Sequence, residues 1–158
     1  MNIMWLYLDT RHGAERALQD RRRMQKILDD GEDRIRQEHE KLTSLESPNM
    51  DGMPHSHNLH AMEDRILTGM ERIKEMTDQY AMAREYMDWF TKAWNAQTEG
   101  DRYVLSRFYG GDEEYGSTAA ADVAEHFDIS TASAYRRKNR ALSNLSLSLF
   151  GKHDVSDW

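Results

Sequence analysis

Cysteine is absent from this chain of 158 residues, and proline occurs only twice, at Pro48 and Pro54. The lack of cysteine excludes disulfide bonds and thiolate metal sites, and it fits a reducing compartment. Because both prolines lie in one short stretch, long helices are permitted on either side of it. Nowhere do apolar and polar residues alternate in the manner of a half-buried strand. The sequence therefore predicts an all-α protein.

The chain is also short of apolar residues. Its mean hydropathy is −0.88, 31% of its residues are charged, and its formal net charge is −7. Such a composition suits helical arms with one buried seam better than a compact globule. Residues 1–8 are apolar, but they are too few to span a membrane and lack the basic lead and cleavage site of a signal peptide. We expect a cytoplasmic protein without a membrane partner.

The strongest pattern in the sequence lies in residues 59–94, where apolar residues recur at alternating spacings of three and four. This is the a/d pattern of a heptad repeat, and it predicts a long helix whose coiled-coil-like face needs a partner. At ~1.5 Å per residue the helix would span on the order of 50 Å. The predicted oligomer or hairpin seam consists of Leu59, Met62, Ile66, Gly69, Ile73, Met76, Tyr80, Ala83, Met87, Phe90 and Trp94.

A weaker version of the same pattern occupies the first third of the chain. Residues 10–45 fit a second helix, although Arg21, Gly31 and Glu38 fall on its seam and interrupt it. Gly31 is a candidate position for a kink. The turn-forming stretch 47–58 separates the two helices, which indicates an antiparallel hairpin. Its seams can pack on each other, on a second subunit, or on both. The weaker seam consists of Ala14, Ala17, Met24, Leu28, Ile35, Leu42 and Leu45.

Three shorter helices are expected after Gly100. The first is expected to be capped by Asp101 and to extend to about residue 109, and the second covers about 119–126. The third begins after a Ser130 cap and extends to about residue 149. We therefore divide the chain into a helical hairpin or oligomerisation arm (1–98, with its loop at 47–58), a helix-turn-helix domain (100–151) and a polar tail (152–158).

The last two of these helices meet the physical requirements of a helix-turn-helix. Ala124 is small enough for a close helix crossing, and Asp128 tolerates the positive φ of a tight turn. Ile129 is an apolar plug, and Ser130 supplies a capping hydroxyl. Four basic residues then occupy five positions, 136–140. The residues expected to pack inward from the last helix are Ala134, Ala141, Leu142 and Leu145.

A helix that starts at an exposed turn and carries arginines on one side is suited to the major groove of double-stranded DNA. We expect Arg136 to contact guanine and Arg140 to contact a phosphate or a more distant base. Thr131 and Ser133 can bind phosphate together with free backbone N–H groups. The negative net charge requires such contact to be local. The complete predicted DNA interface is Thr131, Ala132, Ser133, Tyr135, Arg136, Lys138, Asn139 and Arg140. The alternative is an amphipathic helix whose arginines are merely solvated.

Residues 101–150 resemble the fourth region of bacterial sigma factors. The resemblance rests on Tyr-Val-Leu at 103–105, Ala-Glu at 124–125, Ile-Ser at 129–130 and Arg-Ala-Leu at 140–142. The longer layout is similar to the phage RinA/ArpU-like regulators, in which a charged helix precedes a loop read here as Ser47-Pro48…Gly52-Met53-Pro54. This resemblance implies a phage or prophage activator of late genes that acts beside RNA polymerase. One departure is Arg137, which stands where such modules usually bury Ile or Val, so its stem must snorkel or the helix must roll.

Two other functions remain open from the sequence. A small-terminase-like protein that recognises packaging DNA joins the same parts and predicts a ring-like oligomer. A coiled-coil adaptor would use the basic helix on a protein partner such as RNA polymerase. The regulator itself is expected to be a homo-oligomer, with a dimer favoured by the seam.

No enzymatic activity or cofactor is expected, because no nucleophile–base pair, carboxylate dyad or glycine-rich phosphate loop stands out. A histidine cluster (His55, His57 and His60) has metal-ligand chemistry, but it lies in a turn-rich stretch without a set of carboxylates. We therefore predict no metal site.

Overall fold

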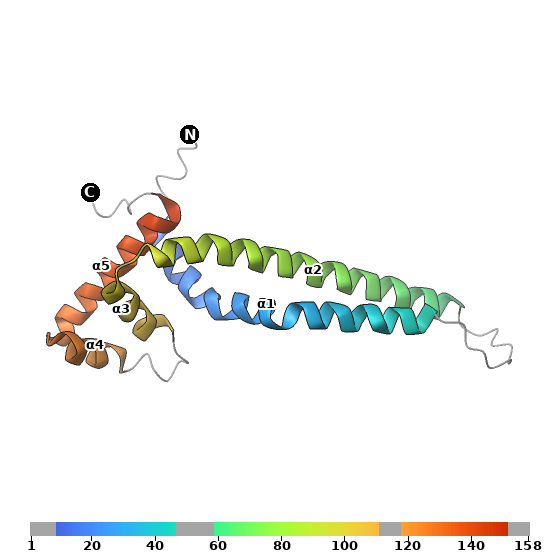
Figure 1. The fold of residues 1–158 in the computed structure, drawn as a ribbon, viewed down its shortest axis with the longest axis horizontal. Helices are drawn as coiled ribbons and strands as arrows, with labels where there is room; N and C mark the ends of the chain where they lie inside the picture. Colours follow the sequence, from blue (N-terminus) through green and yellow to red (C-terminus); the bar gives the residue numbers. More distant parts are fainter. Residues whose placement is uncertain (1–8, 47–58, 111–117, 152–158) are drawn as a thin grey trace. The chain divides into compact units, whose positions relative to one another are not determined.

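The computed structural model describes residues 9–46, 59–110 and 118–151. The described residues are almost entirely helical and contain no strand, which confirms the predicted all-α class. The helices are α1 (Thr10–Glu46), α2 (Leu59–Asn95), α3 (Glu99–Tyr109), α4 (Ala119–Phe127) and α5 (Thr131–Phe150) (Figure 1).

Backbone contacts divide the chain into two compact units. Residues 24–85 form one unit, which we call the arm. Residues up to 23 and from 86 onward form the other, which we call the head. The head thus joins the beginning of α1 and the end of α2 to the three shorter helices. The domain division at residues 98–100 stays a prediction.

The arm is a hairpin of two long helices, as predicted. Within it α1 and α2 lie side by side and run in opposite directions (Figure 1). Ala83 and Met24 are buried, at 0% and 6% exposure. Met62 is 39% exposed, and the side chain of Leu59 lies outside the described residues. The other large apolar seam residues in the arm are half-buried: Leu28, Ile35, Leu42, Leu45, Ile66, Ile73, Met76 and Tyr80. A two-helix seam therefore shields these side chains only in part.

Two glycines in the arm face large side chains of the opposite helix. A Cβ atom at Gly31 would collide with the ring of Tyr80, and one at Gly69 would lie 2.6 Å from Cδ2 of Leu42. Each glycine thus makes room for the partner helix's bulkier residue. α1 continues as one helix through Gly31, so this residue serves close packing where the sequence suggested an interruption.

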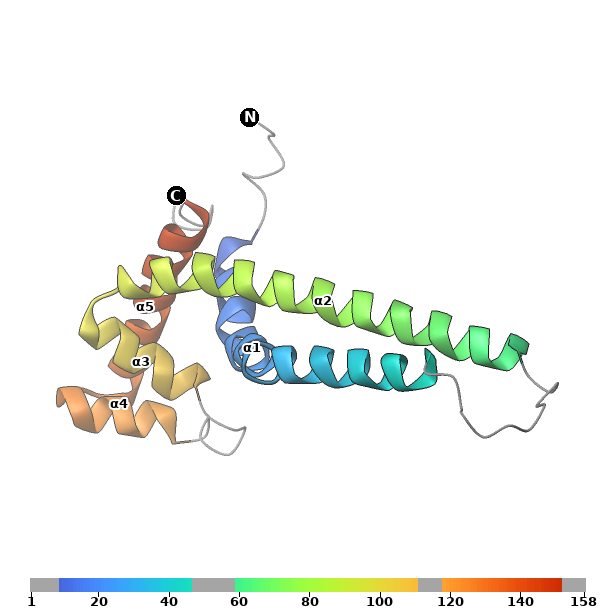
Figure 2. The same ribbon diagram turned by 45° about the vertical axis from the view of Figure 1, so that its right-hand side comes forward.

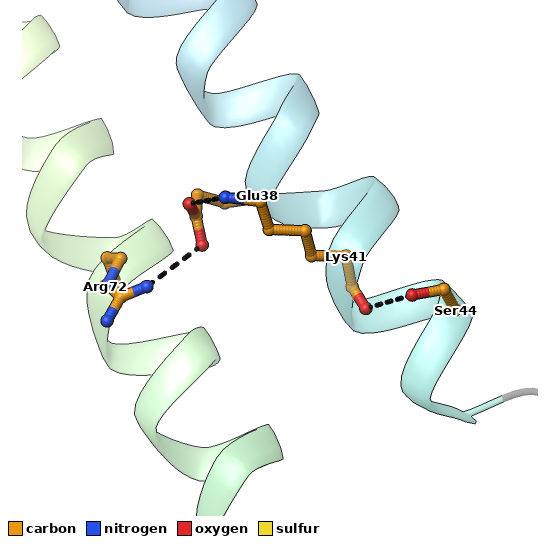
Figure 3. Close-up of polar contacts among 4 residues, drawn as sticks. All are labelled: Glu38, Lys41, Ser44 and Arg72. Carbon is orange, nitrogen blue, oxygen red and sulfur yellow. Dashed lines mark hydrogen bonds and ion pairs between the residues drawn. The ribbon is translucent and has the colours of Figure 1, made fainter.

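Glu38 joins the two helices of the arm by polar contacts. Its carboxylate accepts from Nζ of Lys41 at 2.8 Å and from Nη1 of Arg72, on α2, at 3.4 Å (Figure 3). Ser44, one turn further on, donates its hydroxyl to the carbonyl oxygen of Lys41 at 2.7 Å. The hydrogen bond from Lys41 is the main cause that lowers the pKa of Glu38. A seam position that the sequence marks as an interruption therefore links α1 to α2.

The hydrophobic core of the head is built from all five helices. In Figure 2 α3, α4 and α5 lie together as a compact group. The last turns of α2 and the first turns of α1 add apolar residues to the same core. Its buried members are Ala14, Ala17, Leu18, Phe90, Ala93, Val104, Leu105, Val123, Ala134, Ala141, Leu142, Leu145 and Leu149.

Side-chain contacts attach the start of α1 to the rest of the head. The hydroxyl of Tyr86 donates to the carbonyl oxygen of Ala17, and that of Tyr109 donates to Glu15 at 3.0 Å. Burial raises the pKa of both tyrosines, and the bond to Glu15 adds to the effect at Tyr109. These two half-buried phenols therefore serve as hydrogen-bond donors to α1.

The aromatic end of α2 packs against α5. The indole N–H of Trp89 donates to the carbonyl oxygen of Leu149 at 3.2 Å, and its ring lies 5.8 Å from that of Phe150. Gln97, which is buried, donates to the hydroxyl of Ser148 at 2.8 Å. These contacts hold the second half of α5 in place.

α3 begins earlier than the sequence predicted, and its cap is Thr98. The Thr98 hydroxyl accepts a hydrogen bond from the backbone N–H of Asp101 at 3.2 Å. The prediction that Asp101 caps this helix was therefore wrong. Gly100 lies inside the first turn, where acidic residues on both sides favour the positive end of the helix dipole.

We predict that Gly31 and Tyr80 are energetically coupled. Gly31→Ala should gain up to about 1 kcal/mol of helix propensity in a Tyr80→Ala background, where no ring opposes the new methyl group. With Tyr80 present the ring must move, so the same substitution should gain nothing or destabilise. Chemical denaturation of the four proteins in this double-mutant cycle should show a coupling of at least about 1 kcal/mol. An equal gain in both backgrounds would contradict the packing described here.

Candidate nucleic-acid interface

The connection between α4 and α5 is a tight turn at Asp128. This residue adopts φ 52 and ψ 52, which makes it the only described non-glycine residue with positive φ. The backbone N–H of Ile129 donates to the carbonyl oxygen of Ala124 at 2.9 Å and closes the end of α4. Ser130 then caps α5 by accepting from the backbone N–H of Ser133 at 3.2 Å. The turn, the plug and the cap have the geometry expected of a helix-turn-helix.

One face of α5 is fully buried in the head. Ala134, Ala141 and Leu145 are each 0% exposed, as expected from the sequence, and Leu142 is 3% exposed. They pack in the same core as residues from α3 and α4. Gly151, at φ 69, ends the helix one residue beyond the predicted end. Because this face cannot rotate outward without opening the core, the opposite face has a fixed orientation.

The opposite face of α5 carries the predicted reading residues. Arg136, Asn139 and Arg140 are exposed, and helical periodicity places all three on the side that faces away from Leu145. Thr131 and Ala132 are also exposed, in the first turn. Arg136, Asn139 and Arg140 form a row that presents two guanidinium groups and one amide within little more than one turn of helix.

The other three predicted residues also make contacts within the head. The hydroxyl of Ser133 lies 3.0 Å from that of Ser130 and takes part in the helix cap. Tyr135 lies at the flank of the helix, with its ring 5.7 Å from that of Phe108 on α3. Nζ of Lys138 lies 5.3 Å from the centre of the Phe108 ring and 5.7 Å from that of Tyr135. The flank of α5 beside α3 therefore holds a cation–aromatic cluster.

Arg137 stacks on Phe127. Its guanidinium carbon lies 3.7 Å from the centre of the ring, and the residue is half-buried. Its Nη2 reaches the side of Gly100, where an added Cβ would lie 3.3 Å away. The planar guanidinium thus covers an aromatic face in place of the aliphatic side chain expected at this position. Arg137 stabilises the turn and does not belong to the row of reading residues.

The first half of α5 is the part left accessible by its neighbours in the head. Arg11, near the start of α1, donates to the hydroxyl of Ser143 at 3.0 Å, one turn beyond Arg140. Asn144 donates to Asp101 on α3 at 2.9 Å. These contacts fall in the second half of α5, whereas the residues predicted to contact DNA all lie within its first ten positions, 131–140. The sequence pattern gave no sign of the Arg11 contact, because the two residues are 132 positions apart.

Of the two helices joined by the turn, α5 carries the lysine and the arginines, whereas α4 has none and is acidic. α4 carries Asp122 and Glu125, and Asp128 follows it in the turn. Arg107 on α3 lies 3.9 Å from Asp122. Phosphate groups would thus be attracted by α5 and repelled along α4, which favours a single docking orientation over diffuse attraction.

The structure offers no cluster suited to a metal ion among the described residues. His55 and His57 lie outside them. The fully exposed His60 lies 3.7 Å from Glu63. The described residues add no third ligand that would complete a metal site there. Over 9–46, 59–110 and 118–151, no helix is apolar for long enough to cross a membrane.

The left-handed turn at Asp128 predicts an order of stabilities. Asp128→Gly should raise the free energy of unfolding by up to about 1 kcal/mol, because glycine adopts positive φ without steric cost. Asp128→Ala should lower it by a similar amount. The matched control Glu125→Gly, at an exposed position in α4, should lose about 1 kcal/mol of helix propensity. Urea denaturation measures all three. A Gly variant less stable than the parent would contradict the turn geometry.

Comparison with known proteins found no relative of this chain. No protein-family model matches the chain, and neither the curated proteins nor the solved structures contain a significant match.

Proposed function

We propose that the chain is a sequence-specific DNA-binding regulator of transcription. The observation that carries this proposal is the exposed row of Arg136, Asn139 and Arg140 on a helix whose opposite face is locked in a core. A helix of this kind can enter the major groove of DNA. In this arrangement the first ten residues of α5 read the DNA.

The chemistry of the row supports base reading. An arginine can bond both O6 and N7 of guanine, and an asparagine can bond N6 and N7 of adenine. Thr131 and the free N–H groups of the first turn can hold a phosphate, which fixes the position of the helix. The hydroxyl of Ser133 accepts a hydrogen bond from that of Ser130, so its own O–H can still donate to the same phosphate.

The net charge of −7 bears on how the protein would bind. Non-specific affinity for DNA depends on how many phosphates a protein neutralises. An acidic chain with a few placed cations has a low affinity of this kind, so its binding depends on base contacts. The proposal therefore includes a high ratio of specific to non-specific binding at near-physiological salt.

The finer role rests on the sequence resemblance alone. We propose a phage or prophage activator of late genes that acts with RNA polymerase. No observation in the described residues specifically favours a small-terminase-like protein or a coiled-coil adaptor.

We further propose that the protein is a homodimer. The arm covers its seam from one direction only, and Ile66, Ile73 and Met76 remain half-buried. The arm of a second copy placed across this open edge would complete a four-helix bundle. A symmetric dimer would place its reading helices on half-sites related by a twofold axis.

Selection from random duplex DNA tests the reading helix. The parent should enrich a defined motif, and Arg136→Ala with Arg140→Ala should lose it, because both base-reading cations are removed. The matched control is Arg65→Ala with Arg84→Ala, which removes two exposed arginines from α2 and should keep the motif. If the parent enriches nothing, or the α5 variant enriches the same motif, the proposal is wrong.

Light scattering coupled to size exclusion tests the dimer. The mass should be twice that of the 18.5 kDa chain at micromolar concentration, because the half-buried seam residues gain cover from the second copy. It should fall toward the monomer on dilution if the interface is of moderate size. A monomer at every concentration would refute the dimer and leave the DNA proposal standing.

A further inference from the structure

α2 carries a second apolar row on the side opposite its seam. Leu67, Met70 and Met82 are 59%, 57% and 50% exposed. At ~100° per residue they lie within about 60° of the line through Leu67, whereas Ile73 and Met76 point the other way. The described part of α1 has no exposed large apolar side chain. Within the described part of the arm, only α2 therefore has such a row, and the pairing of α1 with α2 does not need it.

Acidic residues surround this row. Glu63, Glu71, Asp78 and Glu85 lie on the same side of α2 and are exposed. Within residues 60–85, Lys74 is the only lysine or arginine on that side, and its Nζ is bonded to Asp78 at 2.8 Å. The face therefore combines exposed methionine and leucine with a strong excess of negative charge. We call it the acidic face of α2.

The centre of the acidic face is slightly hollowed. An open furrow, bounded mainly by the aliphatic parts of polar side chains, runs along α2 within the arm. Its lining residues are Glu71, Lys74, Glu75, Asp78, Gln79 and Met82. Such a furrow gives an apolar side chain a place to insert between carboxylates.

The negative charge of the acidic face determines which kind of partner it can bind. Two copies of this face laid against each other would bring Glu71, Glu75 and Asp78 against the same acids, with one already paired lysine on each side. Like charges in such positions cost free energy. DNA and anionic membrane surfaces are repelled for the same reason. An occupant must therefore bring positive charge and apolar side chains together.

We propose that the acidic face of α2 binds a basic amphipathic helix of another protein. Apolar residues of that helix would contact Leu67, Met70 and Met82, and its lysines or arginines would face Glu71, Glu75 and Asp78. Flexible methionines adapt to partners of different shape, and exposed apolar residues rimmed by charge are typical of such interfaces. This interaction goes beyond the proposed function, because it uses the arm and no residue of α5.

Fluorescence anisotropy with the full chain tests the proposal. The probe is a labelled leucine–lysine amphipathic peptide of about 18 residues, or five helical turns. A leucine–glutamate peptide of equal length serves as the charge control. Two variants remove the features of the face: Leu67→Ser with Met70→Ser and Met82→Ser, and Glu71→Gln with Glu75→Gln and Asp78→Asn. The matched control removes three exposed acids from α1: Asp29→Asn, Asp33→Asn and Glu40→Gln.

The basic peptide should bind the parent and the α1 control alike, and each α2 variant about tenfold or more weakly, which corresponds to ~1.4 kcal/mol. The acidic peptide should not bind. Equal binding of the basic peptide to all four proteins would overturn the proposal. Loss of self-association in the α2 variants would also overturn it, since the face would then join two copies. DNA selection with the α2 variants should match the parent, so failure here leaves the DNA proposal intact.

Discussion

The one-sided burial of α5 is the constraint on which the head depends. Ala134, Ala141 and Leu145 have no exposed surface, and the core around them includes side chains from each of the helices α1 to α5. Core packing alone fixes the orientation of such a helix about its own axis, so the groups on its outer side are not needed for this. Arg136 and Arg140 can therefore stay exposed, because the cost of orienting them is borne by apolar packing on the other side.

The arm relies on a different kind of fit. Its seam is largely half-buried, and at two positions a glycine on one helix faces a large residue on the other, Gly31 with Tyr80 and Gly69 with Leu42. Polar bonds accompany both pairs. The Tyr80 hydroxyl donates to Glu32 at 2.9 Å, and Glu38 joins Arg72 one turn from Leu42. Exposed bonds of this kind add little stability, but they favour one register of the two helices.

Local signals in the sequence predicted most of the helices. The contacts that the sequence did not predict are mainly those between residues far apart in the chain. Heptad spacing indicated both long helices, and Ser130 was recognised as a cap because capping depends on residues only three positions apart. The prediction of Asp101 as a cap was wrong because α3 includes Gly100 in its first turn, so that the hydroxyl of Thr98 lies at the cap position. The stacking of Arg137 on Phe127 and the contact of Arg11 with Ser143 depend on tertiary packing, which periodicity does not encode.

The head is discontinuous along the chain, and this has a consequence for how the protein folds. Arg11 and Ser143 are 132 residues apart, so the head is completed only when the whole arm has been synthesised and has folded back. Loop closure over that length slows folding unless the hairpin forms first and brings residues 23 and 86 together. The arm would then act as a folding template. A fragment that begins at residue 100 would lack Phe90, Ala93 and Leu18 of the shared core, and would expose apolar surface where α1 and α2 should lie.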